Sequence, residues 1–489
     1  MRIRDLTRRE FLENTAELAA AGGLYALLAR QRASAADLPK PGPADWPRYG
    51  CDIHNTRFNA NEKTIGVSNA AKLKVKWKFD TVDNWIVYQT PAVVGDTLFF
   101  GSGRYAYSLE SATGKLRWKF DWGANGEWEQ ANATSVNTRF WGTRSSPQYY
   151  EGRIYFGASS CVAYCLDAAT GKQLWRTPLI DPKTAERHSA QIFYSPVVYA
   201  GKVYIAYSGG NATIFCLDAD TGAIRWRFRV AQDVPVDFET GGGSPWTSGA
   251  IDEQRNIVYN VTGNNKVVMP NLGLYSESIV AHDMDTGELL WYYQAHPQDD
   301  FDLDFNAHPM IVDAAPPPRI RGNVRNCVVA GNKAGIFCVE RYTGQFFWKV
   351  MLGQICANCG AEFNAIASAY NKIFVQWDSS SSVRPFSASA ALNAYNGDVE
   401  WMVTNNAVNS SPIAVANGVM YQGFLNGKIE ALDARNGKTL WDFSLPSAFR
   451  GGFAIANGAV YAGNGEEGGF KPGDLSKKYS LYCFTPDGK

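Results

Sequence analysis

One recurring segment dominates this chain, and each copy of it contains a tryptophan at the same place. In seven of the eight copies a glycine precedes the tryptophan by four residues. The spacing of successive tryptophans runs from 40 residues (Trp401 to Trp441) to 65 residues (Trp226 to Trp291). The eight residues are Trp77, Trp118, Trp175, Trp226, Trp291, Trp348, Trp401 and Trp441. Repeats of this length indicate a propeller, a solenoid or another array of supersecondary units.

Each repeat consists of short runs of β-forming residues separated by turn residues. Residues 196–207 hold two such runs around a glycine turn, and residues 214–218 and 224–228 supply two more around Thr221-Gly222. Alternating runs with turn residues between them predict antiparallel strands. Four strands per repeat are typical of a propeller blade.

The two ends of the repeat region complement each other. Residues 73–79 read as a final, tryptophan-bearing strand without the strands that should precede it, and residues 479–484 read as a strand without its tryptophan partner. A solenoid would not leave two such fragments at opposite ends. The sequence therefore predicts an all-β fold, an eight-bladed β-propeller of four-stranded antiparallel blades, closed by pairing of the N- and C-terminal strands.

Composition fits one large domain, predicted over residues 36–489. Hydrophobic residues make up 45% of the chain and charged residues 19%, which suits a globular protein with a large core. The 47 basic and 47 acidic residues balance, so no net field would attract nucleic acid. No apolar stretch after the first forty residues is long enough to span a membrane.

The N-terminal 35 residues have the features of an export signal. Residues 7–12 (Thr-Arg-Arg-Glu-Phe-Leu) are similar to a twin-arginine motif, and Ala33-Ser34-Ala35 offers a cleavage site. Glu13 and Glu17 are unusual in an export signal and fit an ordinary amphipathic helix instead, which is the alternative. Export predicts a periplasmic location.

The nine cysteines do not form a zinc or haem motif. Five of them, Cys161, Cys165, Cys216, Cys338 and Cys483, fall on repeat strands and are expected to be small core residues. Cys356 and Cys359 form a single CxxC followed by Gly360 rather than by histidine, so a loop disulfide is expected if the protein is exported.

The chain resembles the eight-bladed quinoproteins over residues 46–489. The opening segments 46–50 (Trp-Pro-Arg-Tyr-Gly) and 55–58 (Asn-Thr-Arg-Phe) and the tryptophan repeat carry the resemblance. These quinoproteins include the PQQ-dependent alcohol dehydrogenases and non-enzymatic relatives such as the outer-membrane assembly lipoprotein propellers. Both kinds share the repeat, so other segments have to distinguish them.

Residues 291–304 are similar to the catalytic segment of the enzymes. The resemblance implies that Asp302 is the catalytic base and that Asp304 is the second carboxylate that marks lanthanide-dependent members, with Phe301 replacing a tryptophan. Asp299, Asp300, Asp302 and Asp304 would also repel one another unless solvent or a cation relieves them. In an extended segment Asp302 and Asp304 share a face and suit a hard cation. A solvated acidic loop is the alternative.

Two further segments are similar to the cofactor site of the enzymes. By resemblance Trp246, in Gly-Gly-Gly-Ser-Pro-Trp, is the floor on which the quinone stacks, Ser244 binds the cofactor and Asn264 is a metal ligand. Lys333 would donate to the quinone oxygens and stabilise the charge that develops there. Weaker matches place Arg144 at a cofactor carboxylate and Asn364 beside the cofactor.

The chain also departs from the pattern of the enzymes. Asn211 stands where the resemblance predicts a metal-binding glutamate, and no adjacent cysteine pair is found in the preceding loop, which reads Val136-Asn-Thr138. Asp304 favours a lanthanide and Asn211 disfavours it, so calcium and a lanthanide both stay open.

The resemblance implies a PQQ-dependent dehydrogenase that oxidises a small alcohol with calcium or a lanthanide ion. Asn264, Asp302, Asp304 and Asn211 would hold the metal. Because the chain has no CxxCH, the electrons would pass to a separate periplasmic cytochrome c. The alternative is a non-enzymatic propeller that acts as an envelope protein-assembly scaffold, since a fold does not determine a function.

Overall fold

The computed structural model describes most of the chain from residue 40 to residue 489. The ranges outside the description are 1–39, 125, 128–141, 182–183, 185–189, 210–211, 233–241, 265–272, 298–302, 353–365, 380–385, 409–410 and 466–477. Residues 1–35, where an export signal is expected, therefore lie outside the described residues, as do Cys356 and Cys359.

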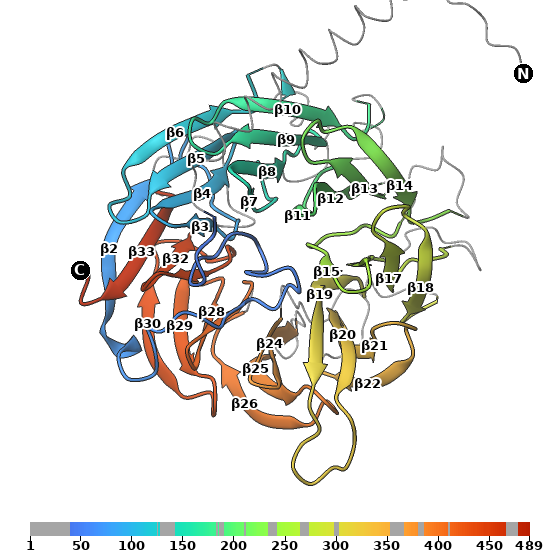
Figure 1. Cartoon of the computed structure of the whole chain (residues 1–489). Helices are drawn as coiled ribbons and strands as arrows, with labels where there is room; N and C mark the ends of the chain where they lie inside the picture. The colour runs from blue at the N-terminus through green and yellow to red at the C-terminus, as the bar shows by residue number, and fades with distance from the viewer. Residues whose placement is uncertain are drawn as a thin grey trace, which may run out of the picture.

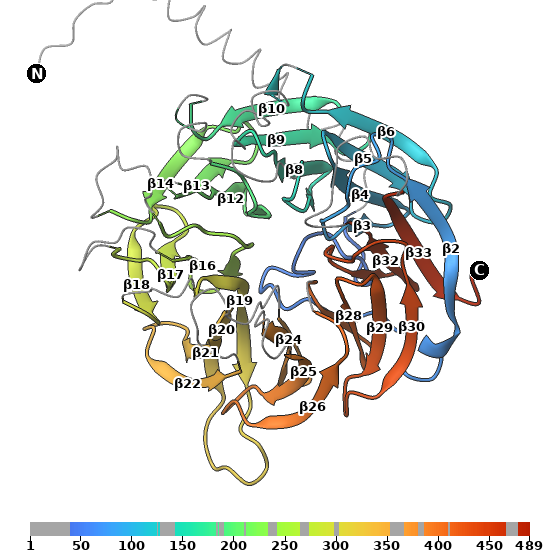
Figure 2. The ribbon, with the colours of Figure 1, turned by 180° about the vertical axis from the view of Figure 1, so that it is seen from behind.

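The described strands form eight antiparallel blades around a central axis (Figure 1; Figure 2). From the axis outward, blade I is β3 (Ala92–Val94), β4 (Thr97–Ser102), β5 (Tyr105–Glu110) and β6 (Leu116–Asp121). Blade II is β7 (Gln148–Tyr150), β8 (Arg153–Gly157), β9 (Val162–Asp167) and β10 (Gln173–Pro178). Blade III is β11 (Val197–Tyr199), β12 (Lys202–Tyr207), β13 (Thr213–Asp218) and β14 (Ile224–Arg229). Blade IV is β15 (Ala250–Asp252), β16 (Ile257–Val261), β17 (Ser278–Asp283) and β18 (Leu289–Gln294).

The second half of the ring has the same plan. Blade V is β19 (Phe305–Ala314), β20 (Arg325–Asn332), β21 (Gly335–Glu340) and β22 (Phe346–Met351). Blade VI is β23 (Ala367–Ala369), β24 (Lys372–Ser379), β25 (Phe386–Asn393) and β26 (Val399–Asn405). Blade VII is β27 (Ala414–Ala416), β28 (Val419–Gly423), β29 (Lys428–Asp433) and β30 (Thr439–Ser444), with the short β1 (Phe58–Asn59) added at its axial edge. The fold class predicted from the repeat is confirmed.

Blade VIII joins the two ends of the repeat region. It combines β31 (Ala454–Ala456), β32 (Ala459–Gly463) and β33 (Ser480–Pro486) with β2 (Leu73–Asp80), which follows the 3-10 turn η1 (Ala70–Lys72). The two terminal strands pair antiparallel, and Trp77 lies opposite Cys483. The predicted closure is confirmed, and it completes blade VIII as a four-stranded sheet like the other blades.

The repeated tryptophan connects each blade to the next one. Trp175 of blade II donates its indole N–H to the Ala219 carbonyl of blade III at 2.9 Å, and Trp441 of blade VII donates to Leu73 of blade VIII at 2.9 Å. The repeated glycine packs on the tryptophan of the preceding blade. A Cβ at Gly222 would lie 2.6 Å from the Trp175 ring, and the glycine has φ +73°. A side chain is therefore excluded there for two independent reasons.

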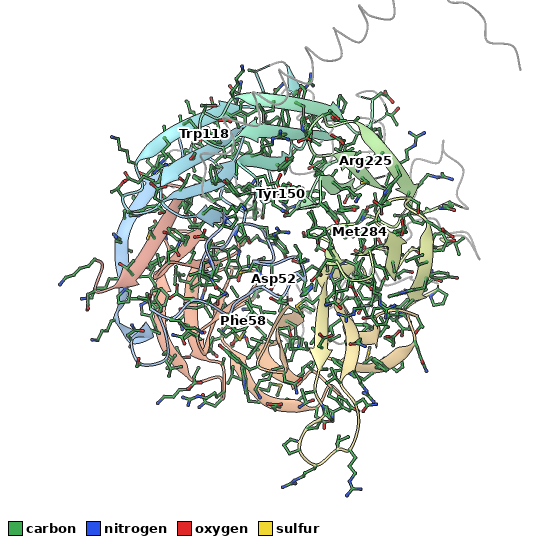
Figure 3. All side chains as sticks on the ribbon, viewed as in Figure 1. Asp52, Phe58, Trp118, Tyr150, Arg225 and Met284 are labelled. Atoms are coloured by element: carbon green, nitrogen blue, oxygen red, sulfur yellow. The ribbon has the colours of Figure 1, made fainter. Side chains whose placement is uncertain are left out.

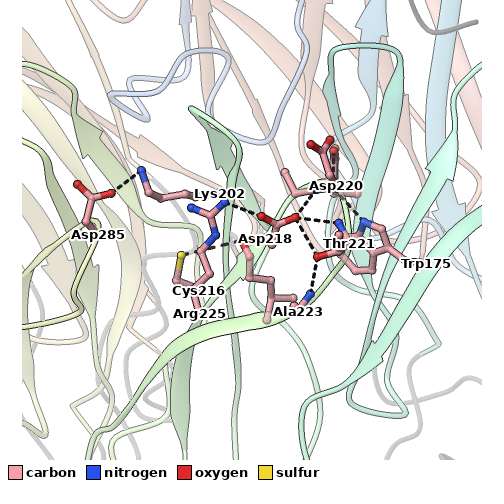
Figure 4. A network of polar contacts seen from close by, with 12 residues as sticks. Trp175, Lys202, Cys216, Asp218, Asp220, Thr221, Ala223, Arg225 and Asp285 are labelled. Carbon is pink, nitrogen blue, oxygen red and sulfur yellow. Dashed lines mark hydrogen bonds and ion pairs between the residues drawn. The ribbon is translucent and has the colours of Figure 1, made fainter. Parts of the chain in front are cut away.

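The turn that carries this glycine is fixed by an aspartate, as blade III shows (Figure 4). One carboxylate oxygen of Asp218 accepts hydrogen bonds from the backbone N–H groups of Asp220 and Thr221 and from the Thr221 hydroxyl, at 2.9–3.0 Å. Local bonds of this kind make Asp and Thr preferred turn residues. Lys202 of blade III also reaches Asp285 of blade IV at 2.7 Å, which adds a second contact between these blades.

Residues 44–59, here called the hub segment, cross the axis of the ring. Asp52 and Phe58 lie near the centre, whereas Trp118 and Arg225 lie near the rim (Figure 3). Carbonyl groups of the hub segment accept hydrogen bonds from the innermost strands of blades I, II, IV, V, VI and VII. The donors are the backbone N–H groups of Val93, Tyr149, Ile251, Ile311, Ser368 and Val415. The hub segment thus satisfies donors that the axial edges of these strands would otherwise leave unpaired.

Arg57 holds the hub segment in place from within. It is fully buried, and its guanidinium donates to the carbonyls of Ile413, Tyr49 and Phe453 at 2.5, 2.6 and 3.3 Å. The guanidinium carbon lies 4.7 Å from the centroid of the Tyr49 ring, a cation–π distance. The resemblance of residues 55–58 to a family opening segment thus has a structural basis at the axis.

The core lies between adjacent blades, where large clusters of apolar side chains are buried. The five cysteines expected in the core are all buried, as predicted. Among the residues that the structure describes, no helix has the length and apolar character needed to cross a membrane.

Candidate functional site

Four of the predicted site residues lie together on blades IV and V. Asp304, immediately before β19, accepts the backbone N–H of Asn264 at 2.7 Å and the indole N–H of Trp246 at 3.3 Å on one carboxylate oxygen. Its other oxygen accepts from the Lys333 ammonium at 3.0 Å. Three loops, two of blade IV and one of blade V, therefore converge on one carboxylate.

Backbone bonds position these loops. Gly243 donates to the Asn264 carbonyl at 2.8 Å, and Gly263 donates to the Ser244 carbonyl at 2.9 Å. A Cβ at Gly263 would overlap Asp304 and lie 2.7 Å from the Trp246 indole nitrogen, so only glycine allows this approach. The Ser244 hydroxyl, a predicted cofactor contact, accepts the backbone N–H of Gly209 at 3.2 Å.

Asp304 and Lys333 form a largely buried ion pair. Their side chains are 8% and 16% exposed, and the Lys333 backbone N–H also donates to Leu303 at 2.8 Å. Breaking a buried pair by removing one partner typically costs about 3–5 kcal/mol, because a charge is left without compensation. A carboxylate offers about four lone-pair sites, so three donors leave little room for another ligand. A cation at Asp304 would therefore compete with Lys333.

A cavity of about 240 Å³ lies on the axis beside Trp246. Tyr49 of the hub segment lines it together with side chains from most of the blades, including Arg144, Phe193 and Arg450. Phe193 contacts the Trp246 ring at a centroid distance of 5.2 Å, and the Arg144 guanidinium lies 4.9 Å from the Phe193 centroid. Arg144, a weaker match in the sequence, is thereby placed in the same cavity as Trp246.

Two titratable side chains at the hub segment, His308 and Tyr49, are uncharged at physiological pH. His308 is fully buried, and burial lowers its pKa well below the usual value of 6.5, with the nearby Arg57 charge lowering it further. Its Nδ1 lies 3.4 Å from the Tyr49 hydroxyl, and burial raises the pKa of Tyr49. A neutral imidazole and a neutral phenol therefore meet next to the axis.

Three predicted site residues lie outside the described residues: Asp302, Asn211 and Asn364. Among the residues that are described, no cluster of three or more His, Cys, Asp or Glu side chains could hold a metal. Of the predicted metal ligands, Asn264 and Asp304 are described and adjacent.

Sequence reasoning missed the residues that the axis contributes. Asn306 and Arg450 line the cavity but match none of the motifs, and Tyr49 lies in the opening segment 46–50, to which no site role was assigned. One signal was available for Arg450, because it occupies the place in its repeat that Arg144 and Trp246 occupy in theirs, four residues before an innermost strand.

Comparison with known proteins gives the family. Residues 46–357 match the family model described as the glucose/ethanol/alcohol dehydrogenase beta-propeller domain. The chain belongs to this family. Residues 386–471, in blades VI to VIII, match the model of the outer membrane protein assembly factor BamB.

The curated relatives that this chain matches are longer than the chain. A quinohemoprotein alcohol dehydrogenase of Comamonas testosteroni is 30% identical over 64% of this chain and 47% of its own length. The chain thus spans about half the length of the curated relatives it matches. The solved quinohemoprotein alcohol dehydrogenase ADHIIG of Pseudomonas putida HK5 superposes with a TM-score of 0.78 at 18% identity, over 91% of this chain and 81% of that chain. A europium-containing methanol dehydrogenase gives 0.74 at 20% identity, over 91% and 98%. At these identities the structures share the fold alone.

The described residues fit a planar, carboxylate-bearing quinone. The cavity combines an aromatic surface at Trp246 with a guanidinium at Arg144, and the missing side chain at Gly263 brings the backbone close to both Trp246 and Asp304. The Thr247 hydroxyl and the Asn306 side-chain oxygen are buried without a hydrogen-bond partner among the described residues. Buried polar atoms of this kind call for a ligand or a water.

Proposed function

We propose that this protein is a PQQ-dependent dehydrogenase that oxidises a small alcohol in the periplasm and passes the electrons to a separate cytochrome c. The observation that carries the proposal is the convergence of Trp246, Asn264 and Lys333 on Asp304, next to an axial cavity that contains Arg144. A binding scaffold has no evident need for this set of groups.

In this proposal one group of residues binds the cofactor and Asp302 transfers the proton. Trp246 supports the plane of the quinone, and Arg144, Ser244 and Asn364 fix its polar edge. Asp302 accepts the proton of the substrate hydroxyl, as a carboxylate general base does. When bound, PQQ supplies the hydride acceptor and the metal ion polarises it, so the alcohol leaves as an aldehyde or ketone.

Lys333 and Asp304 set the charge beside the cofactor. The ammonium of Lys333 is held by Asp304 and is available to stabilise negative charge that develops on a neighbouring oxygen. A calcium or lanthanide ion bound by Asn264, Asp302, Asp304 and Asn211 would replace Lys333 as the partner of Asp304. Lys333 would then be free to turn toward the quinone.

The test is reconstitution of the purified protein with PQQ and either calcium or lanthanum, followed by alcohol-dependent reduction of a dye. Asp302→Asn should lower the rate by roughly 100- to 10,000-fold, the usual contribution of a general base. Asp313→Asn is the matched control, because Asp313 lies at the end of β19 that is remote from Asp304 and its side chain is 62% exposed. An unchanged rate in Asp302→Asn would contradict the assignment of the base.

An assembly scaffold is the second candidate function, supported by the BamB match over residues 386–471. The two functions separate in the same experiment. A scaffold reduces no dye with either metal, whereas a dehydrogenase reduces it with at least one of them.

A further inference from the structure

Five blades each contribute to the cavity a side chain from the same position relative to their innermost strand. The residue four positions before the first residue of the innermost strand is Tyr88 in blade I, Arg144 in blade II, Phe193 in blade III, Trp246 in blade IV and Arg450 in blade VIII. All five side chains line the axial cavity. Two residues further along, Ser146, Ser195 and Ser248 also line it. Side chains at equivalent places of five consecutive blades thus form one continuous arc.

Two glycines bring the Arg450 end of this arc against blade I. A Cβ at Gly451 would lie 2.8 Å from the Val87 carbonyl, and a Cβ at Gly452 would overlap the Thr90 hydroxyl. Blade VIII therefore approaches blade I here with backbone rather than with side chains. Arg450, directly before this pair, is held at the blade that carries Tyr88.

Arg144 flanks Tyr88 from the other side. Its guanidinium carbon lies 4.9 Å from the centroid of the Tyr88 ring. The two arginines thus occupy equivalent positions on the two blades on either side of Tyr88, and both line the same cavity. No described residue that lines the cavity is acidic. Two guanidinium groups with hydroxyl groups beside them favour a ligand with more than one carboxylate.

We propose that Arg450 is a second anchor of the cofactor, and that it binds a different carboxylate of the tricarboxylate quinone from the one that Arg144 binds. The proposal rests on the proposed function for the identity of the ligand. The aromatic members of the arc, Tyr88, Phe193 and Trp246, supply the surface for the ring, and the arginines fix its rotation on that surface.

Binding of PQQ to the apoprotein, followed by quenching of tryptophan fluorescence, tests this role without turnover. Arg450→Gln should weaken PQQ binding roughly 10- to 100-fold, as expected for loss of one charge-assisted contact. Arg450→Lys should recover part of the affinity, because lysine keeps the charge but not the planar fork. Arg435→Gln is the control, since Arg435 lies on the surface of blade VII with its side chain 74% exposed.

The ligand provides a second arm of the test. The trimethyl ester of PQQ lacks the carboxylate charges, so Arg450→Gln should change its binding by less than it changes that of PQQ. Thermal melting of each variant establishes that it is folded. Equal PQQ affinities of a folded Arg450→Gln variant and the natural protein would overturn the proposal.

A failure of the proposed function would look different. If the natural protein binds no PQQ, that function is wrong, and citrate replaces PQQ as the probe of the arginine pair. Citrate binding that Arg450→Gln weakens supports a polycarboxylate site with two arginines, whereas no citrate binding overturns the arginine pair as well.

Discussion

At the scale of single residues, burial strongly shifts the pKa of one histidine that lies among aromatic rings. His282 on β17 is fully buried, its ring lies 4.3 Å from that of Phe228, and neither ring nitrogen has a partner among the described residues. Burial lowers the pKa of His282 to about 3. The folded protein therefore keeps this imidazole neutral under conditions in which the unfolded chain protonates it.

The consequence is a loss of stability in acid. The folded pKa of about 3 lies below the ordinary value of 6.5, so stability is lost as the pH falls from 6.5 toward 3. From pH 8 to pH 5 this one group should lower the free energy of unfolding by about 2 kcal/mol. In His282→Leu the difference between denaturant midpoints at the two pH values should shrink accordingly. Met284→Leu, in the same buried cluster, should keep the difference, and an unchanged difference in His282→Leu would refute the assignment.

At the scale of elements, the contact between blades II and III depends on Gly222, because a side chain at this position would overlap Trp175. Gly222 and Gly201 have nearly the same φ, +73° and +72°, but a Cβ at Gly222 meets Trp175 whereas a Cβ at Gly201 meets nothing within 4 Å. Both glycine-to-alanine variants should lose about 1–2 kcal/mol of stability, because alanine is strained in the left-handed conformation. Gly222→Ala should lose about 1–3 kcal/mol more stability than Gly201→Ala, because its new methyl group overpacks against Trp175. Equilibrium unfolding in urea measures the difference, and equal losses would show that the glycine serves the turn alone.

The sequence predicted the elements better than it predicted the contacts between them. Blades and closing strands follow from local patterns, since alternation and turn residues act over a few neighbours. The packing of Gly222 on Trp175 joins residues of successive repeats, and no pattern within one repeat contains it. The hub segment contains only the two-residue strand β1, and its other residues run along the axial edges of the blades, so no strand periodicity predicts its course. Arg450 is a single residue in a loop, and its equivalence to Arg144 is recognised only from its place four residues before an innermost strand.

At the scale of the whole molecule, two segments make eight separate blades into one closed ring. The hub segment binds their axial edges, with carbonyls of Pro47, Ile53 and His54 accepting from blades II, IV and V. The β2–β33 pair closes the circumference, since Leu73 of β2 also accepts the Trp441 indole from blade VII. Stability should therefore be a property of the ring rather than of individual blades.

Removal of β33 tests this directly. Truncation after Lys478 deletes the strand between β2 and β32, so β2 loses its partner and blade VIII loses its connection to blade I through Trp77. The truncated protein should lose its single cooperative thermal transition, and a synthetic peptide of residues 479–489 should restore it by refilling the gap. Deletion of Gly488 and Lys489 alone is the control, because it leaves the register from Leu73–Pro486 to Asp80–Ser480 intact and removes two hydrogen bonds at Thr485. An unchanged melting midpoint after the longer truncation would mean that the ring holds together without its closing strand, as an open array would.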